Sequence, residues 1–158
     1  AVALPGLWPL FLGNVNGSLG ETSALACLIG GLYLCWRRSA AWEIPVWTIA
    51  GAAGAAVVAN LLDPATPLTV PHHLLAGALL FCAFFIATDP VSSPLSPKGR
   101  AIFGLGVGVI VVVIRTLSAY PEGVVFAVLL MNAFTPLINR GTVPKPFGGV
   151  AAPPGGAK

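Results

Sequence analysis

A single carboxylate stands in a polar turn between two apolar stretches, in the sequence Thr88-Asp89-Pro90 followed by Ser92 and Ser93. A carboxylate and hydroxyl groups provide the hard oxygen ligands that a small cation prefers. Pro90 lacks a backbone N–H donor and biases the preceding residue away from the helical conformation. Ionisable groups near a membrane core are costly and mark ion or cofactor sites. Thr88 and Asp89 are therefore predicted to lie on an ion path.

Two charged residues also have interpretations that require no ligand. Asp89 could be an ordinary turn residue paired with Lys98 and Arg100, and such exposed pairs contribute well under about 1 kcal/mol. Arg115 could extend toward the membrane surface or pair with Glu122 across a short turn. Both alternatives stay open at the level of the sequence.

A second polar segment, residues 13–23, reads GNVNGSLGETS. Glycines let backbone amides approach a ligand, and a helix N-terminus favours an anion. Ser18 and Glu21 also have the spacing of a capping box, which needs no ligand. The segment is therefore either a ligand-facing loop or a capped helix entry.

Histidines and cysteines do not have the spacing of metal ligands. His72 and His73 are adjacent, and neighbouring side chains on a helix point about 100° apart, so interfacial hydrogen bonding is predicted for them. Cys27, Cys35 and Cys82 fall in apolar segments. They are predicted to be packing residues, neither disulfides nor metal ligands.

Composition defines the class of protein. The chain has 158 residues, of which 56% are hydrophobic and 8% charged, whereas soluble domains carry about 25% charged residues. This indicates an integral membrane protein. The formal net charge of +3 comes mainly from loops and the C-terminal tail, so the positive-inside rule explains it better than nucleic-acid binding. No signal peptide is visible, and the chain is expected to be part of a longer protein.

The apolar stretches predict an all-α membrane fold of five transmembrane helices. Each is about as long as a ~30 Å hydrocarbon core requires. Gly51 and Gly54 lie among alanines at a spacing that suits close helix packing, and Ser96-Pro97 is a helix start signal. The predicted helices cover residues 18–36, 44–62, 71–87, 97–117 and 121–138.

The loops and termini complete the predicted organisation. Residues 1–17 are expected to form an interfacial lead-in, 18–140 the five-helix domain and 141–158 a disordered tail. Cations concentrate in alternate loops and the tail, and carboxylates in the others, which predicts an external N-terminus and a cytoplasmic C-terminus. The cations on the cytoplasmic side would be Arg37, Arg38, Lys98, Arg100, Arg140, Lys145 and Lys158, while Glu21, Asp63, Glu122 and Arg115 would be external.

Three stretches resemble motifs of one membrane family: residues 13–26, which contain GSLGETSALA, residues 87–91 (ATDPV), and residues 120–138, which contain YPEGV and LMNA. The family comprises the D subunit of the Rnf-type ion-translocating ferredoxin:NAD oxidoreductase and the B subunit of the sodium-translocating NADH:quinone reductase. The resemblance covers roughly residues 11–140, and the serine-rich turn is more similar to the Rnf branch.

The resemblance implies a fold and a cofactor. Family members have ten helices in two inverted five-helix repeats, similar to urea and ammonium channels, so this chain would be one repeat, the C-terminal one. Members carry FMN attached to a threonine in a Ser/Thr-Gly-Ala-Thr motif, which this chain lacks. In an intact subunit the flavin would face Asn14, Ser18, Glu21 and Thr22. Many relatives also end the last helix with an aspartate where this chain has Asn139.

The resulting hypothesis is a C-terminal part of an Rnf-type D subunit in the bacterial inner membrane. Together with its missing N-terminal half and with other membrane and peripheral subunits, it would hold FMN and couple electron transfer between ferredoxin and NAD to Na⁺ or H⁺ movement. It would not be catalytic alone. The alternatives are half of a small-solute or ion channel without redox activity, and a purely structural membrane subunit.

Overall fold

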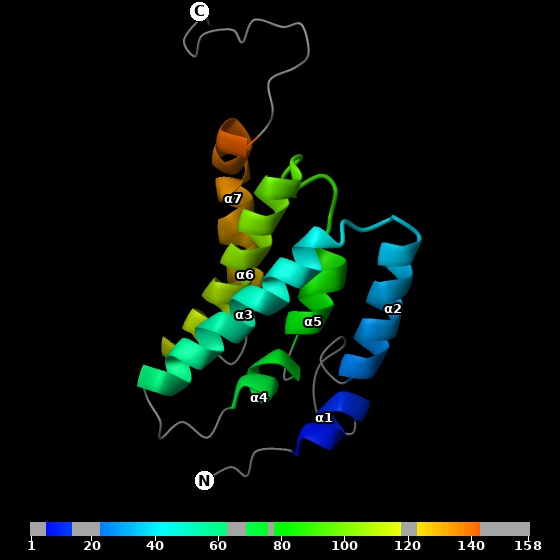
Figure 1. Cartoon of the computed structure of the whole chain (residues 1–158), viewed down its shortest axis with the longest axis vertical. Coiled ribbons are helices and arrows are strands. Elements are labelled where there is room, and N and C mark those ends of the chain that lie inside the picture. The colour runs from blue at the N-terminus through cyan, green and yellow to red at the C-terminus, as the bar shows by residue number, and fades with distance from the viewer. Residues whose placement is uncertain (1–5, 14–22, 63–68, 76–77, 118–122, 143–158) are drawn as a thin grey trace, which may run out of the picture.

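The computed structural model describes residues 6–13, 23–62, 69–75, 78–117 and 123–142, and every element within them is helical (Figure 1). The all-α class is therefore confirmed. Helices α3, α6 and α7 are long and apolar enough to cross a membrane. The elements are α1 (Leu7–Leu12), α2 (Ala24–Trp36), α3 (Glu43–Leu62), α4 (Val70–Leu75), α5 (Leu79–Phe81), the π-helix η1 (Cys82–Ile86), α6 (Pro97–Leu117) and α7 (Val124–Thr142).

Helix α2 is shorter than the predicted helix over 18–36. Its N-cap is Ser23, whose backbone is extended (φ −129°, ψ 104°) and whose hydroxyl accepts a hydrogen bond from the Ala26 amide at 3.2 Å. A helix cannot run through an extended residue, so the predicted start at Ser18 is wrong. Ser18 and Glu21 lie outside the described residues.

The C-terminus of α2 is a Schellman motif. The amide of Ser39 donates to the Leu34 carbonyl and the amide of Arg38 donates to the Cys35 carbonyl, both at 3.0 Å. Arg38 has a φ of 56° and occupies the left-handed position that glycine usually fills. A side chain there costs about 1 kcal/mol, so local backbone geometry does not explain why arginine stands at this position.

The third predicted helix, 71–87, is not continuous. Helix α4 ends at Leu75, Ala78 has ψ 12° outside the helical range, and α5 then leads directly into η1. In η1 the Ala87 amide donates to the Cys82 carbonyl five residues earlier, at 2.8 Å. The extra residue in this wider turn changes which side chains face α2, a rearrangement that apolar periodicity does not reveal.

The start of α6 at Pro97 and the end of α3 at Leu62 agree with the predicted bounds. Helix α7 differs at its end, because it continues through Thr142 where closure after residue 138 was predicted. The Thr142 hydroxyl donates to the Ile138 carbonyl at 2.7 Å, which satisfies one of the last carbonyls of the helix. The helix thus enters the segment that was predicted to be a tail.

Helices α3 and α6 form the closest helix pair. A Cβ atom on Gly104 would lie 2.7 Å from the Ile44 carbonyl oxygen, and one on Gly108 would overlap the Thr48 carbonyl oxygen. Gly51 makes the corresponding approach from α3, 2.6 Å from the backbone of α6. Small residues four apart let two backbones touch in this way. The close packing predicted from Gly51 is confirmed, whereas Gly54 has open space around it.

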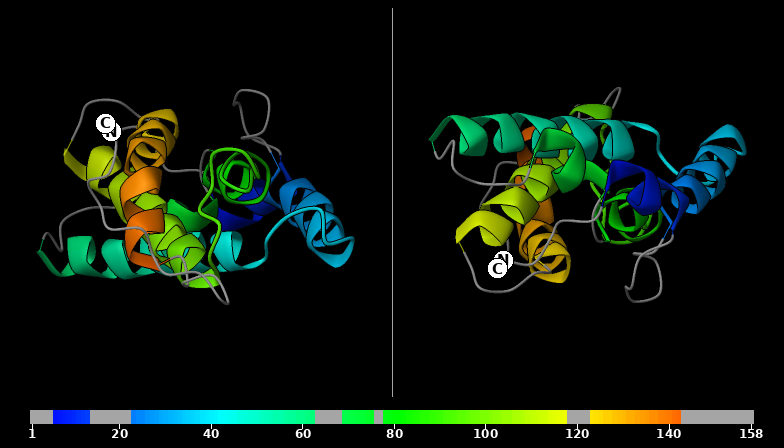
Figure 2. Two further views of the ribbon diagram at one scale, coloured as in Figure 1. Left: turned by 90° about the horizontal axis from the view of Figure 1, so that it is seen from above. Right: turned by 90° about the horizontal axis from the view of Figure 1, so that it is seen from below.

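The apolar core has two parts. The larger lies between α3, α5, α6 and α7 and includes Cys82 and Phe103, and the smaller joins α2 to η1 around Cys27 and Phe84. Figure 2 shows α5 and η1 between α2 on one side and the α3, α6 and α7 group on the other. Cys27 and Cys82 pack within these two clusters as the sequence predicted.

Candidate functional site

One end of the bundle gathers most of the described charges. We call it the basic end; it is the upper end in Figure 1, where α2 and α7 finish and α3 and α6 begin. The carboxylate of Glu43 lies in the first turn of α3, and Arg140 lies in the last turn of α7. Both placements complement the helix dipoles. The charged residues of the basic end are Arg37, Arg38, Glu43, Asp89, Lys98, Arg100 and Arg140.

The predicted ion-path residues lie in this end and have local partners. The buried Thr88 hydroxyl donates to the Phe84 carbonyl at 2.7 Å. The exposed Asp89 carboxylate accepts hydrogen bonds from the Ser92 amide at 3.2 Å and from the Ser92 hydroxyl at 3.0 Å. The Asp89 carboxylate therefore organises its own turn while remaining accessible to solvent.

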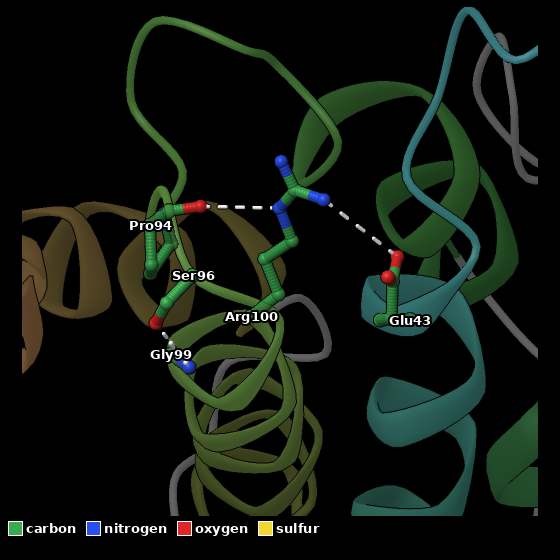
Figure 3. A network of polar contacts seen from close by, with 5 residues as sticks. All are labelled: Glu43, Pro94, Ser96, Gly99 and Arg100. Atoms are coloured by element: carbon green, nitrogen blue, oxygen red, sulfur yellow. Dashed lines mark hydrogen bonds and ion pairs between the residues drawn. The ribbon is translucent and has the colours of Figure 1, made fainter. Parts of the chain in front are cut away.

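Arg100 does not use Asp89 as its partner. Its Nε donates to the Pro94 carbonyl at 3.2 Å and its Nη1 lies 3.9 Å from Oε2 of Glu43, as Figure 3 shows. Beside it, the Ser96 hydroxyl caps α6 by accepting from the Gly99 amide at 3.0 Å. Arg100 thereby joins the loop before α6 to the first turn of α3.

A second contact ties the same loop to α7. Oδ1 of Asn139 accepts a hydrogen bond from the Leu95 amide at 3.1 Å. Asn139 stands where the resemblance leads one to expect an aspartate, and its side chain accepts a hydrogen bond that holds the loop to α7. An aspartate could accept the same bond, so the difference concerns charge rather than this contact.

These elements enclose a cavity of about 530 Å³ at the basic end. We call it the polar cavity. Thr88 and Ser93 line it from the turn, whereas Asp89 and Ser92 are not among its lining residues. The remaining lining residues are Cys35, Arg38, Ser39, Ala40, Ala41, Trp42, Glu43, Pro90, Pro94, Leu95 and Arg100.

The opposite end has a larger and more apolar cavity of about 770 Å³ along α3 and α6. His73 is buried there, and its backbone carbonyl accepts a hydrogen bond from Nη1 of Arg115 at 2.8 Å. His72 instead shares a 2.6 Å hydrogen bond with the Thr69 hydroxyl. The hydrogen bonding predicted for the two histidines is thus seen at the side chain of His72, whereas the side chain of His73 is buried rather than interfacial. Among the described residues, histidine, cysteine, aspartate and glutamate form no cluster of three that could hold a metal.

Several residues with a predicted role lie outside the described part of the chain. Glu122, the proposed partner of Arg115, is one of them. The same holds for the four side chains expected to face a flavin, Asn14, Ser18, Glu21 and Thr22.

Sequence reasoning missed the residues that join the elements of the basic end. Glu43 was not predicted to belong to a site, although it is an acidic residue in the first turn of an apolar helix, a common stabilising position. Asn132, in the middle of α7, was recognised only as part of a motif. Its Oδ1 atom is buried and has no hydrogen-bond partner within the described part of the chain.

The helices define the chain as a membrane protein: three of them, α3, α6 and α7, have the length and apolarity of membrane spans. Comparison with known families then gives a match over residues 2–148, nearly the whole sequence, and the chain belongs to the NQR2, RnfD, RnfE family. The family resemblance predicted from the three motifs is thereby confirmed.

Individual relatives carry consistent names. The chain is 52% identical over 137 residues to the D subunit of the ion-translocating oxidoreductase complex of Halorhodospira halophila, covering 87% of this chain and 38% of the relative. It is 42% identical over 149 residues to the D subunit of the proton-translocating ferredoxin:NAD(+) oxidoreductase complex of Clostridium ljungdahlii, covering 88% and 42%. The chain thus spans about two fifths of the length of the curated relatives it matches.

Proposed function

We propose that this chain is part of the membrane-embedded D subunit of an ion-translocating oxidoreductase complex. The observation that carries the proposal is the family match over residues 2–148, supported by the relatives' names. In the proposed complex, electron transfer between ferredoxin and NAD drives Na⁺ or H⁺ across the bacterial inner membrane. The partners are the rest of the subunit and other membrane and peripheral subunits. This chain would supply one repeat of a ten-helix inverted-repeat fold.

The proposed orientation places the basic end in the cytoplasm. Five arginines and lysines of the described chain lie there, namely those at positions 37, 38, 98, 100 and 140, whereas Arg115 lies at the other end. Bacterial membrane proteins concentrate such residues on the cytoplasmic side. The ends of α2 and α7 and the starts of α3 and α6 would then face the cytoplasm.

FMN is the proposed cofactor of the intact subunit. The amide, hydroxyl and carboxylate groups of Asn14, Ser18, Thr22 and Glu21 form a donor and acceptor set that suits a ribityl chain and the polar edge of a flavin ring. When bound, FMN would supply one- and two-electron transfer, and the protein would orient it and tune its electrostatic surroundings.

Flavin content provides the test of this function. The intact complex, purified in detergent, is expected to retain FMN, whereas the polypeptide of residues 1–158 should show no flavin fluorescence on a denaturing gel because it lacks the Gly-Ala-Thr acceptor. A flavin-free complex that carries a solute or ion flux without redox partners would instead support the channel alternative. A fluorescent band at this polypeptide would refute the assignment of the attachment site.

We further propose that Asp89 and Thr88 lie on the cytoplasmic part of the ion path. Asp89 is exposed at the basic end, and Thr88 lines the polar cavity beside it. Both provide oxygen atoms, and the bonds described above leave further lone pairs on each. An exposed carboxylate at the proposed entry side can attract a cation before it enters the membrane.

Asp89→Asn removes this charge and keeps an oxygen that can accept the two Ser92 hydrogen bonds. The apparent affinity of turnover for the coupling cation is expected to fall on the order of tenfold, because a charged ligand contributes more than a neutral one. The measurement is cation-dependent turnover of the whole complex, with flavin content as an internal standard. Ser92→Ala, which perturbs the turn and keeps the charge, is the matched control. Equal cation dependence in Asp89→Asn and the unmodified complex would make Asp89 a turn residue only.

A further inference from the structure

The polar cavity has a net positive lining. Arg38, which follows the end of α2, and Arg100, in the first turn of α6, both line it, and the carboxylate of Glu43 is the only acidic group among the lining residues. Two guanidinium groups and one carboxylate leave an excess of one positive charge. The N-terminus of α3, at the same cavity, adds the positive end of a helix dipole. The part of the cavity around Arg38 and Arg100 therefore favours an anion.

Both arginines have donors available for such an anion. Arg100 uses Nε for the Pro94 carbonyl and Nη1 for a long contact with Glu43, and its Nη2 has no protein hydrogen bond within the described residues. The Arg38 side chain is exposed and makes no ion pair or hydrogen bond with the described residues. Arginine donors in a fork suit phosphate oxygens in particular.

The position of Arg38 is a separate indication of a role for its side chain. It occupies the left-handed residue of the Schellman motif, where glycine would be unstrained. An arginine held in that conformation at the mouth of a cavity is compatible with a ligand contact that glycine could not make.

Part of the rim of the cavity is apolar. Trp42 and Leu95 line it and are 62% and 69% exposed, and Trp36 and Val91 nearby along the chain are 81% and 90% exposed. Tryptophan concentrates where a protein crosses the headgroup region of a bilayer. Arginines beside exposed apolar side chains, at the end of helices with the length of membrane spans, match the two chemical parts of a phospholipid.

We propose that the polar cavity binds the headgroup phosphate of an anionic phospholipid, with Arg38 and Arg100 as its ligands. Basic pockets between membrane helices on the cytoplasmic side recognise lipid headgroups in this manner. Glu43 holds Arg100 only through a long contact and competes with the phosphate for it. The proposal requires the basic end to lie at a membrane surface and does not depend on flavin or on ion movement, so it can fail while the proposed function stands.

Native mass spectrometry measures lipid binding to this site. The detergent-purified complex is titrated with phosphatidylglycerol or phosphatidylcholine. Phosphatidylglycerol is expected to bind, and phosphatidylcholine to bind more weakly. Arg100→Gln and Arg38→Gly should each weaken phosphatidylglycerol binding about fivefold and together about thirtyfold, since each basic residue near the headgroups contributes a similar increment. The control pair is Arg37→Gln and Arg140→Gln, which removes two charges of the same end that do not line the cavity.

Arg38→Gly and Glu43→Gln separate lipid binding from folding. Arg38→Gly relieves the left-handed strain, so the thermal midpoint should stay unchanged or rise while lipid binding falls. Glu43→Gln removes the competitor of the phosphate and should strengthen phosphatidylglycerol binding. Equal losses in the control pair, or no loss in Arg38→Gly and Arg100→Gln, would overturn the proposal. Displacement of the lipid by millimolar inorganic phosphate would show that the cavity holds a free anion instead.

Discussion

Gly108→Val is expected to destabilise the protein by about 3 kcal/mol or more, because the added side chain meets backbone. A Cβ atom at this position would overlap the Thr48 carbonyl oxygen and lie 2.7 Å from the Ala52 amide nitrogen. Neither atom can move without displacing the whole of α3. The helices must then separate, and the apolar contacts between them are lost along their length.

The measurement is the thermal midpoint and the monodisperse yield of the complex in detergent. Gly54→Ala is the matched control, because Gly54 lies on α3 of the same helix pair and has nothing within 4 Å of its added Cβ. This control should change stability by less than about 1 kcal/mol, in the direction of the higher helix propensity of alanine. Similar losses at both positions would show that general helix propensity, and not backbone contact, determines stability here.

Gly31→Ala is expected to cost about 2 kcal/mol by pushing α2 away from η1. The new Cβ would overlap the ring of Phe84 and lie 2.7 Å from its Cβ atom, and Phe84 is only 5% exposed. Phe84→Ala alone should cost about 3–5 kcal/mol through the cavity it leaves. In the double variant the overlap with the ring is gone and only the contact with the Cβ atom of residue 84 remains, so the combined loss should be smaller than the sum by about 1 kcal/mol.

Thermal unfolding of the four proteins, the unmodified chain, both single variants and the double variant, measures this coupling. Gly30→Ala is the neighbouring control, since its Cβ would approach only the far end of the half-exposed Phe85 ring, at 3.0 Å. That ring can rotate away, so a small effect is expected. Strict additivity of Gly31→Ala and Phe84→Ala would mean that α2 does not pack on η1 in the membrane.

The parts of the fold that depend on local signals could be predicted from the sequence. A serine followed by a proline favours the start of a helix, and α6 begins at Pro97 with Ser96 as its cap. The long apolar stretches predicted α3, α6 and α7 because hydrophobicity over a membrane thickness is a property of the segment alone. Close packing of α3 also followed from its small residues, although the partner surface, Gly104 and Gly108, did not.

The parts that depend on tertiary contacts could not be predicted. The non-helical backbone of Ala78 and the wide turn of η1 accompany the packing of Phe84 on Gly31, two residues far apart in sequence. Ser18 and Ser23 both have capping chemistry, and only the folded chain distinguishes them. Within the site, Asp89 was recognised from its neighbours in sequence, whereas the role of Glu43 depends on its contact with Arg100 on the adjacent helix α6.

The glycine contact between α3 and α6 also has a consequence for biogenesis. Residues 63–96 separate the two helices, so α3 leaves the ribosome and the translocon well before its main partner has been made. During that interval its flat glycine and alanine surface meets lipid. A helix without strongly polar groups on that surface tolerates contact with lipid. A helix with unpaired polar groups on that surface would instead associate with non-native helices or with chaperones before its partner was made. The small residues that let the backbones of α3 and α6 touch in the folded protein therefore also let α3 remain in the lipid before α6 is inserted.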